Sequence, residues 1–240
     1  MNVGSLFSGI GGFDLGLERA GFTISWQVEI DPYCQRVLAK HWPTVPRYGD
    51  ICAVDWGTVE PVDVLCGGFP CQDLSFAGKR AGIDGARSGL WSEYVRTIRH
   101  LRPRLVLVEN VPGLLSNAYM GRVLGDLAQS GYDAEWDCIP ASAVGAPHRR
   151  DRVWIVAYPA GSAVEKCSMV LPERLYGESG GMGWQALPGT HWEAHQPSMV
   201  GVAHGVPQRM AQLTAIGNAV VPQIVEALGR MILDVELRRA

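Results

Sequence analysis

Short apolar runs alternate with segments of helical apolar spacing along roughly the first two thirds of the chain. Four of the runs predict strands, which we place at Val3–Phe7, Ile24–Glu29, Val62–Cys66 and Leu105–Glu109. The segments around them predict helices at Phe13–Ala20, from Pro32 to about His41 and at Leu90–Leu101. The start of the second helix is marked by Asp31 as an N-cap, followed by proline at the first helical position. This alternation predicts an α/β fold, with a mainly parallel sheet covered by helices on both faces.

The second half of the chain extends this sheet and then changes character. Two more strands, Tyr132–Pro140 and Arg152–Ala157, are expected to pair with each other. Residues 158–205 are rich in Gly, Pro, Ser, His and Trp and lack clear periodicity, which indicates a small irregular insert. A last helix, expected to pack back on the first part, is indicated by the helical spacing of Ile224, Leu228, Met231 and Val235. We therefore divide the chain into residues 1–157, 158–205 and 206–240.

The composition is that of a folded chain with room for one large domain. Of the 240 residues, 47% are hydrophobic and 19% are charged. No apolar run approaches the ~18 residues of a membrane span, and the start lacks the basic leader and apolar run of a signal peptide. The six cysteines form no CxxC pair, so we interpret them as free thiols in a reducing compartment. We therefore expect a cytoplasmic protein without a membrane contact.

The net charge of −3 does not by itself indicate a nucleic-acid-binding protein. Between Lys79 and Arg104, however, seven basic residues stand against two acidic ones. Such a run suits phosphate binding, but basic runs are more often solvated surface. Charge alone therefore favours the solvated surface.

The first predicted strand runs into a glycine-rich turn, residues 7–12 with the sequence FSGIGG. Glycine lets the backbone approach a ligand closely, and the start of the following helix offers free N–H groups. Glu29 closes the second strand, where a carboxylate can accept both ribose hydroxyls of a nucleotide-like ligand. Asp50 follows the third strand region and can accept the amino group of adenine. The turn alone is as often structural, but the three features together favour an adenosine-containing ligand.

A cysteine follows the fourth predicted strand, within the segment Gly67–Gln72. Most cysteines are buried and inert, so the surroundings of Cys71 decide between an inert and a reactive thiol. Cys71 follows Pro70 at the carboxyl end of a strand, where a parallel sheet opens its ligand crevice. Lys79 and Arg80 come shortly after it, and nearby cations promote the thiolate form. These surroundings favour a reactive cysteine.

Charged residues also stand at the ends of the later strands. Glu109 ends the strand Leu105–Glu109, either as a helix-capping acid or as a carboxyl beside the thiol in the same crevice. Arg150 and Arg152 alternate in the turn between the last two strands, so both can project to one side. They either join this site or pair with surface carboxylates.

Together these segments resemble the C5-cytosine-specific DNA methyltransferase family of bacterial and phage type. The similar stretches occur in the family's order and include LFSGIGGFDLGLERAGF, GGFPCQDLSFAGKR, ENVPGLL, GAPHRRDRVW and IGNAVVPQ. The resemblance implies a Rossmann-like S-adenosylmethionine-dependent methyltransferase sheet, in which residues 158–205 are a small target-recognition insert. It also implies methyl transfer from S-adenosylmethionine to carbon 5 of a flipped-out cytosine in duplex DNA.

The same resemblance assigns roles to individual positions. Cys71 corresponds to the nucleophile, Glu109 to the acid that engages the cytosine ring, and Arg150 with Arg152 to the paired arginines of the active site. The implied cofactor contacts are Phe7, Ser8, Gly9, Gly11, Gly12, Glu29, Ile30, Asp50, Ile51, Pro70, Asn218 and Ala219. The positions expected to contact DNA are Lys79, Arg80, Arg87 and Arg209. No metal is expected.

Two features depart from the family pattern, and other interpretations are kept beside it. The chain has His148 where the family usually has glutamine, and its recognition segment is short. A nicotinamide-dependent dehydrogenase would share the glycine turn and the acidic strand end, and an inactive DNA-binding relative would share the fold. A zinc enzyme could use His191 and His195, but no further ligands stand at suitable spacing. As partners we expect double-stranded DNA for a monomeric enzyme, with a cognate restriction endonuclease as one candidate genetic partner.

Overall fold

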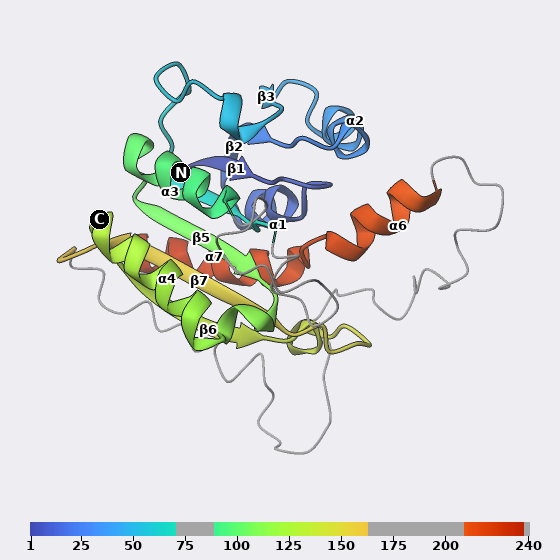
Figure 1. The fold of residues 1–240 in the computed structure, drawn as a ribbon. Coiled ribbons are helices and arrows are strands. Elements are labelled where there is room, and N and C mark those ends of the chain that lie inside the picture. Colours follow the sequence, from blue (N-terminus) through green and yellow to red (C-terminus); the bar gives the residue numbers. More distant parts are fainter. Residues whose placement is uncertain (71–88, 163–208, 238–240) are drawn as a thin grey trace.

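Within the described residues, seven strands form one sheet in the order β3-β2-β1-β4-β5-β7-β6 (Figure 1). The structure is a computed structural model, and it describes residues 1–70, 89–162 and 209–237. The strands are β1 (Asn2–Leu6), β2 (Thr23–Val28), β3 (Arg47–Tyr48), β4 (Val64–Gly67), β5 (Leu105–Asn110), β6 (Tyr132–Ile139) and β7 (Arg152–Pro159). The α-helices are α1 (Gly12–Ala20), α2 (Pro32–His41), α3 (Leu90–Leu101), α4 (Asn117–Gln129), α6 (Arg209–Asn218) and α7 (Pro222–Leu237). Short 3-10 helices are η1 (Ile51–Ala53), η2 (Pro112–Leu115) and η3 (Ala141–Val144).

The strands β1 to β5 run parallel, and the strand pairing reverses at β7. β1 pairs with β2 and β4, β2 with β3, and β4 with β5, all in parallel. β7 is antiparallel to both β5 and β6. The predicted mainly parallel sheet and the predicted pairing of the last two strands are confirmed. Because the chain moves outward from β1 to β3 and then crosses to β4, the carboxyl ends of β1 and β4 form a topological switch point.

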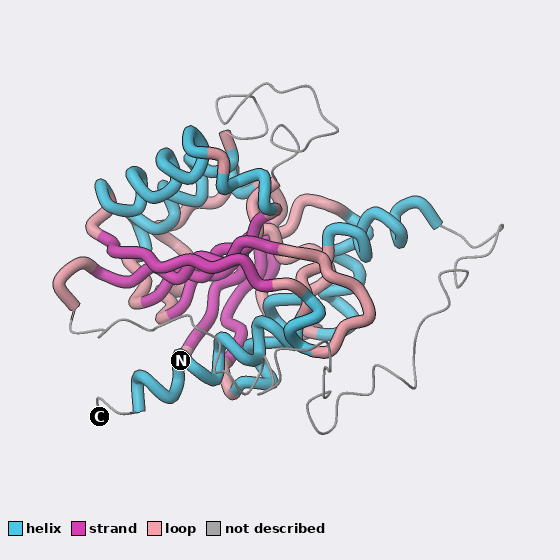
Figure 2. The backbone as a smooth tube through the Cα atoms, turned by 90° about the horizontal axis from the view of Figure 1, so that it is seen from below, coloured by secondary structure: helices cyan, strands magenta, loops and turns pink. Residues whose placement is uncertain are grey.

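Each face of the sheet is covered by its own pair of helices, as predicted (Figure 2). On one face, α3 and α4 pack over a core that contains Tyr94 and Leu65. On the other face, α1 and α7 pack over a core that contains Leu17, Leu228 and Val64. Neighbouring residues of β4 thus point into different cores, which explains why this strand is apolar at successive positions.

The start of α2 lies where its capping signal predicts it. The Asp31 side chain accepts the backbone N–H of Tyr33 and Cys34 at 2.8 and 3.0 Å, and Pro32 begins α2. α6 was not predicted, because residues 209–218 have no single apolar face. Of the described side chains of α6, only Ala215 is buried.

The C-terminal helices contain the one candidate membrane span among the described residues. Met210–Leu237 is long and apolar enough to cross a membrane by length and composition, which the sequence analysis did not expect. Within this stretch α7 packs on α1 and buries Ile224, Val225 and Leu228. A core helix has the same signature, so the stretch is weak evidence for a membrane span.

The expected three-part division of the chain stays a prediction. β7 runs to Pro159, two residues beyond the first expected boundary. Residues 163–208, which make up nearly all of the expected insert, lie outside the described residues. α7 does pack back on the first part, as its apolar spacing predicts.

Candidate active site

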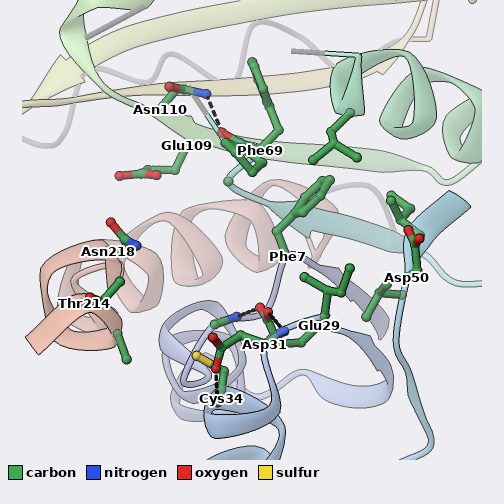
Figure 3. Close-up of a pocket in the computed structure, with 18 of the residues that line it drawn as sticks. Phe7, Glu29, Asp31, Cys34, Asp50, Phe69, Glu109, Asn110, Thr214 and Asn218 are labelled. Carbon is green, nitrogen blue, oxygen red and sulfur yellow. Dashed lines mark hydrogen bonds between the residues drawn. The ribbon is translucent and has the colours of Figure 1, made fainter. Parts of the chain in front are cut away.

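The carboxyl ends of the parallel strands surround a cavity of about 620 Å³ (Figure 3). Segments after β1, β2, β3, β4 and β5 form its walls, together with the first residue of β7 and part of α6. Open α/β sheets bind ligands at such a switch point. The predicted site residues that line the cavity are Phe7, Gly9, Glu29, Ile30, Asp50, Ile51, Pro70, Glu109, Arg152 and Asn218.

Glu29 is fixed at the end of β2 by hydrogen bonds to the backbone. Its two carboxylate oxygens accept the N–H groups of Gly9 and Asp31, each at 2.7 Å. Burial raises the pKa of Glu29, while these two N–H donors oppose the shift. Each oxygen keeps a second acceptor position. The carboxylate can therefore also accept hydroxyl groups of a ligand in the cavity.

Asp50 forms another part of the wall, after β3 (Figure 3). Ile51 lines the cavity next to it in the chain. The Asp50 side chain caps η1 by accepting the N–H of Cys52 at 2.9 Å, and it retains further acceptor positions. Ile30, on the same cavity, is 67% exposed and offers apolar surface to a flat ring. Two carboxylates with an apolar surface fit the hydroxyls, amino group and ring of an adenosine-containing cofactor.

Four other predicted cofactor positions are not among the cavity-lining residues. Ser8 is buried, and its hydroxyl donates to the carbonyl of Ser5 at 3.0 Å. A Cβ on Gly12 would lie 2.7 Å from the Val220 carbonyl oxygen, so glycine lets α1 begin directly against the turn between α6 and α7. The remaining two are Gly11 and Ala219. The role of all four as cofactor contacts stays a prediction.

Glu109 is a buried carboxyl at the end of β5. Arg152 Nε lies 3.0 Å from Glu109 Oε1, and the two side chains are 20% and 11% exposed. Burial raises the pKa of Glu109 to about 6, although the Arg152 and Arg150 charges oppose the shift. The carboxyl can therefore hold or release a proton close to neutral pH, as a group that exchanges a proton with a ligand must.

The segment directly before Cys71 is tied to the end of β5. Asn110 Nδ2 donates to the Phe69 carbonyl at 3.1 Å. A Cβ on Gly68 would lie only 2.9 Å from Glu109 Oε2, so glycine leaves room for that carboxyl. The ends of β4 and β5 are thus held together, and Cys71 follows Pro70 in the sequence. Cys71 itself lies outside the described residues.

Arg150 has different partners from Arg152. One nitrogen of its guanidinium, Nη2, donates to the carbonyls of Gly217 and Ala219 at 2.9 and 2.8 Å. These two carbonyls lie on either side of Asn218. Arg150 is not among the cavity-lining residues. Of the two predicted arginines, the structure therefore brings Arg152 into the ion pair with Glu109.

Several predicted site residues cannot be placed, because they lie outside the described residues. They are Cys71, Lys79, Arg80, Arg87, His191 and His195. Arg209 begins α6, and its side chain is likewise outside the described part. His148 is exposed in the turn before β7. Among the described residues, no group of three or more His, Cys, Asp or Glu is placed to hold a metal ion.

The cavity also contains residues that the sequence analysis did not single out for it. Asp31 was identified only as a helix cap, yet its N–H helps to fix Glu29. Asn110 belongs to the recognised segment ENVPGLL. Its hydrogen bond to Phe69 joins the ends of β4 and β5, which are far apart in the sequence, so neither segment alone predicts it. Met210 and Thr214 line the cavity from a helix that the apolar pattern does not predict.

The reversed last strand pair and the carboxylate-lined cavity at the switch point fit the class of Rossmann-like methyltransferases. The model of the C-5 cytosine-specific DNA methylase family matches residues 1–180. The chain therefore belongs to this family, as its motifs predict. The dehydrogenase and zinc-enzyme interpretations are set aside.

Individual relatives agree with this assignment. The chain is 41% identical over 167 residues to the type II methyltransferase M2.BsuMI of Bacillus subtilis, a match that covers 65% of this chain and 42% of the relative. It is 33% identical over 195 residues to the type II methyltransferase M.AquIA of a Picosynechococcus species, covering 73% and 77%. Among solved structures, it is similar to an Escherichia coli protein from prophage Cp described as a DNA modification methyltransferase, with a TM-score of 0.57 and 30% identity over 66% of this chain and 47% of that one.

Most of these matches span only part of the relatives. The chain spans about half the length of several curated relatives, for example 42% of M2.BsuMI and 53% of M.NgoPII from Neisseria gonorrhoeae. A crystal structure of a Spodoptera frugiperda DNMT2 variant is similar with a TM-score of 0.56 and 20% identity, and this likeness concerns the fold alone.

Proposed function

We propose that the chain is a DNA (cytosine-5-)-methyltransferase, which transfers a methyl group from S-adenosylmethionine to carbon 5 of a flipped-out cytosine in duplex DNA. The observation that carries this proposal is the ion pair of buried Glu109 with partly buried Arg152, which lines the same cavity as Glu29 and Asp50. One continuous space thus offers a protonatable carboxyl for a base and fixed carboxylates for a nucleoside.

The residues around Glu29 are assigned to the cofactor. Glu29 would accept ribose hydroxyls, because its carboxylate is held in place by two N–H groups and keeps free acceptor positions. Asp50 would accept the adenine amino group, and Phe7 and Ile30 would cover the apolar parts. When bound, S-adenosylmethionine supplies the sulfonium methyl group that carbon 5 receives.

Glu109 is the group assigned to the cytosine ring. Its carboxyl, with a pKa of about 6, would share a proton with N3 and stabilise the electron density that arrives there. Arg152 keeps this carboxyl oriented through the contact of 3.0 Å. A proton held at N3 makes carbon 6 of the ring more electrophilic and prepares it for a nucleophile.

Family resemblance assigns that nucleophile to Cys71. Its thiolate would form a bond from sulfur to carbon 6, which makes carbon 5 nucleophilic enough to be methylated. A base would then remove the proton from carbon 5, and the sulfur–carbon bond would break to free the enzyme. Extruding the cytosine costs a few kcal/mol. Phosphate contacts assigned to Lys79, Arg80, Arg87 and Arg209 would offset this cost.

The proposed reaction is tested with labelled S-adenosylmethionine and duplex DNA. The wild type should transfer the labelled methyl group to cytosine and form a covalent adduct with DNA that contains 5-fluorocytosine. Cys71→Ala should lose both activities, and Glu109→Gln should transfer about 10²–10⁴-fold more slowly, since an amide cannot exchange the proton. Asp133→Asn, an exposed acid on β6, is the matched control and should behave as wild type.

Methyl transfer by Cys71→Ala at the wild-type rate would contradict the mechanism. No transfer by the wild type on any duplex would instead favour an inactive DNA-binding relative. The protein could also be expressed in a methylation-free bacterial host, whose genome offers many candidate duplexes at once. Bisulfite sequencing of that genome would map the methylcytosines and identify the target sequence.

The proposal also covers the cellular location, the oligomeric state and the partners of the protein. We assign the protein to the cytoplasm of a bacterial or phage-infected cell, where it would act on double-stranded DNA as a monomer. A cognate restriction endonuclease is the candidate genetic partner. Analytical ultracentrifugation with and without a duplex would test the monomer and its DNA complex.

A further inference from the structure

α6 forms part of the cavity wall although little of it is buried. Thr214 and Asn218 line the cavity from this helix (Figure 3). Of its described side chains only Ala215 is buried, and Figure 1 shows α6 extending away from the sheet. Apolar packing therefore fixes this wall weakly, which gives more weight to the polar contacts at its ends.

Arg150 supplies a polar contact at the C-terminal end of α6. The last carbonyls of an α-helix lack partners within the helix and carry a partial negative charge. Arg150 Nη2 donates to one such carbonyl, of Gly217 in the last turn, at 2.9 Å, and to the carbonyl of Ala219, the first residue after α6, at 2.8 Å. A charged donor at this position satisfies both carbonyls and stabilises the negative end of the helix dipole.

The backbone and surroundings of Arg150 show that this contact is demanding to form. Its φ is 39°, in the left-handed region that residues other than glycine uncommonly adopt. Burial lowers the pKa of Arg150, and the neighbouring Arg152 charge lowers it further. An arginine that loses hydration and adopts this backbone needs compensating contacts. The two carbonyls on either side of Asn218 provide them.

We propose that Arg150 is a positioning residue, which caps α6 and thereby holds Asn218 in the cofactor cavity, whereas Arg152 acts on Glu109. The inference rests on the proposed function, because it takes S-adenosylmethionine as the ligand of this cavity. It gives different roles to Arg150 and Arg152, which the family resemblance assigns together to the active site. One arginine would serve the base and the other would serve the cofactor, with only Asp151 between them in the chain.

Calorimetric binding of S-adenosylhomocysteine in the absence of DNA tests this division. Arg150→Ala is expected to weaken binding by about tenfold or more. Arg150→Gly should show the same loss, and glycine suits the φ of 39°, so this second variant protects the test against misfolding. Arg149→Ala is the matched control, because the Arg149 side chain is 84% exposed and should not affect binding. Thermal unfolding without ligand would verify that each variant is folded.

A rate measurement separates positioning from direct action on the base. In single-turnover methyl transfer, saturating S-adenosylmethionine should restore the rate of the Arg150 variants but not that of Arg152→Ala. The inference would be overturned by wild-type affinity in folded Arg150 variants, or by a low rate that saturation does not restore. A wild-type protein that does not bind S-adenosylhomocysteine would overturn the proposed function itself, and this inference with it.

Discussion

Asp14 is a fully buried carboxyl on α1, outside the residues that line the cavity. It accepts hydrogen bonds from Ser5 Oγ at 3.1 Å and from Gln27 Nε2 at 2.7 Å, and so links α1 to β1 and β2. Burial raises the pKa of Asp14 from 3.8 to about 6, although both donors oppose the shift. The folded state therefore keeps this proton to a higher pH than the unfolded chain does.

The pH dependence of the free energy of unfolding should reveal the raised pKa of Asp14. Between pH 3.8 and about 6 the folded state binds more protons at this site than the unfolded state, so its contribution to the free energy of unfolding falls as the pH rises. The total loss is up to about 3 kcal/mol. Asp14→Asn keeps the size and an acceptor for Gln27 but removes the titration. Urea unfolding at several pH values should show that the free energy of unfolding of the variant rises relative to that of the wild type from pH 4 to 6.

The control for this experiment is Asp133→Asn, which makes the same chemical change at an exposed acid on β6, away from Asp14. Its unfolding free energy should follow that of the wild type across the same pH range. Parallel curves for Asp14→Asn and the wild type would show that burial does not raise the pKa of Asp14 in the folded protein.

The start of α1 and the turn between α6 and α7 fit together without room for a side chain. The backbone of Val220 occupies the space beside Gly12, and Asn218 stands two residues before Val220. The glycine-rich turn thus has two functions at the level of elements. Gly9 donates to Glu29 at the cavity, while Gly12 admits the turn that carries Asn218.

Gly12→Ala should therefore damage both stability and cofactor binding. The added methyl group must displace backbone at Val220, which costs about 1–3 kcal/mol in a well-packed region and shifts Asn218. Gly121→Ala is the matched control, since a Cβ there meets nothing within 4 Å and alanine favours the interior of α4 by about 0.5–1 kcal/mol. Thermal unfolding and S-adenosylhomocysteine binding measure both effects, and equal behaviour of the two variants would contradict the packing argument.

At the level of elements, the apolar periodicity predicted the strands and helices whose position depends on the local sequence pattern. The apolar runs located the main strands, and the cap formed by Asp31 with Pro32 located the start of α2. α6 has no such pattern, because only one of its described side chains is buried. The partners of Arg150 lie 67 and 69 residues away, so its alternation with Arg152 could not predict that the two side chains separate. Family resemblance named Glu109, but its raised pKa depends on burial by neighbouring strands.

At the level of the whole molecule, the cavity joins segments from both ends of the described chain. Its walls include Phe7 after β1, Glu109 at the end of β5 and Asn218 at the end of α6. Two separate cores, one on each face of the sheet, hold these segments in place. A ligand that contacts all of them binds the folded state alone and must stabilise it.

S-adenosylhomocysteine should therefore raise the unfolding temperature. At about 100 times its dissociation constant a ligand adds about 2.7 kcal/mol, which corresponds to roughly 5–10 °C for a chain of this size. Glu29→Gln should reduce the shift, because an amide cannot accept from both N–H groups as the carboxylate does. Glu60→Gln changes an exposed acid and should keep the full shift. Differential scanning calorimetry measures the rise in unfolding temperature. An equal rise for both variants would exclude Glu29 from the ligand site.

The reversal of β7 decides which charges this edge of the sheet can possess. A parallel strand delivers its last residue to the carboxyl edge, whereas an antiparallel strand delivers its first, which here is Arg152. Had β7 run with the others, the guanidinium would have lain at the opposite end of the strand, about 23 Å away over the seven steps of an eight-residue strand. An inverted strand is therefore a means by which a chain can place a cation opposite acids that arrive from the other direction. Evolution could exchange the residues at that entry point while the five parallel strands stayed unchanged.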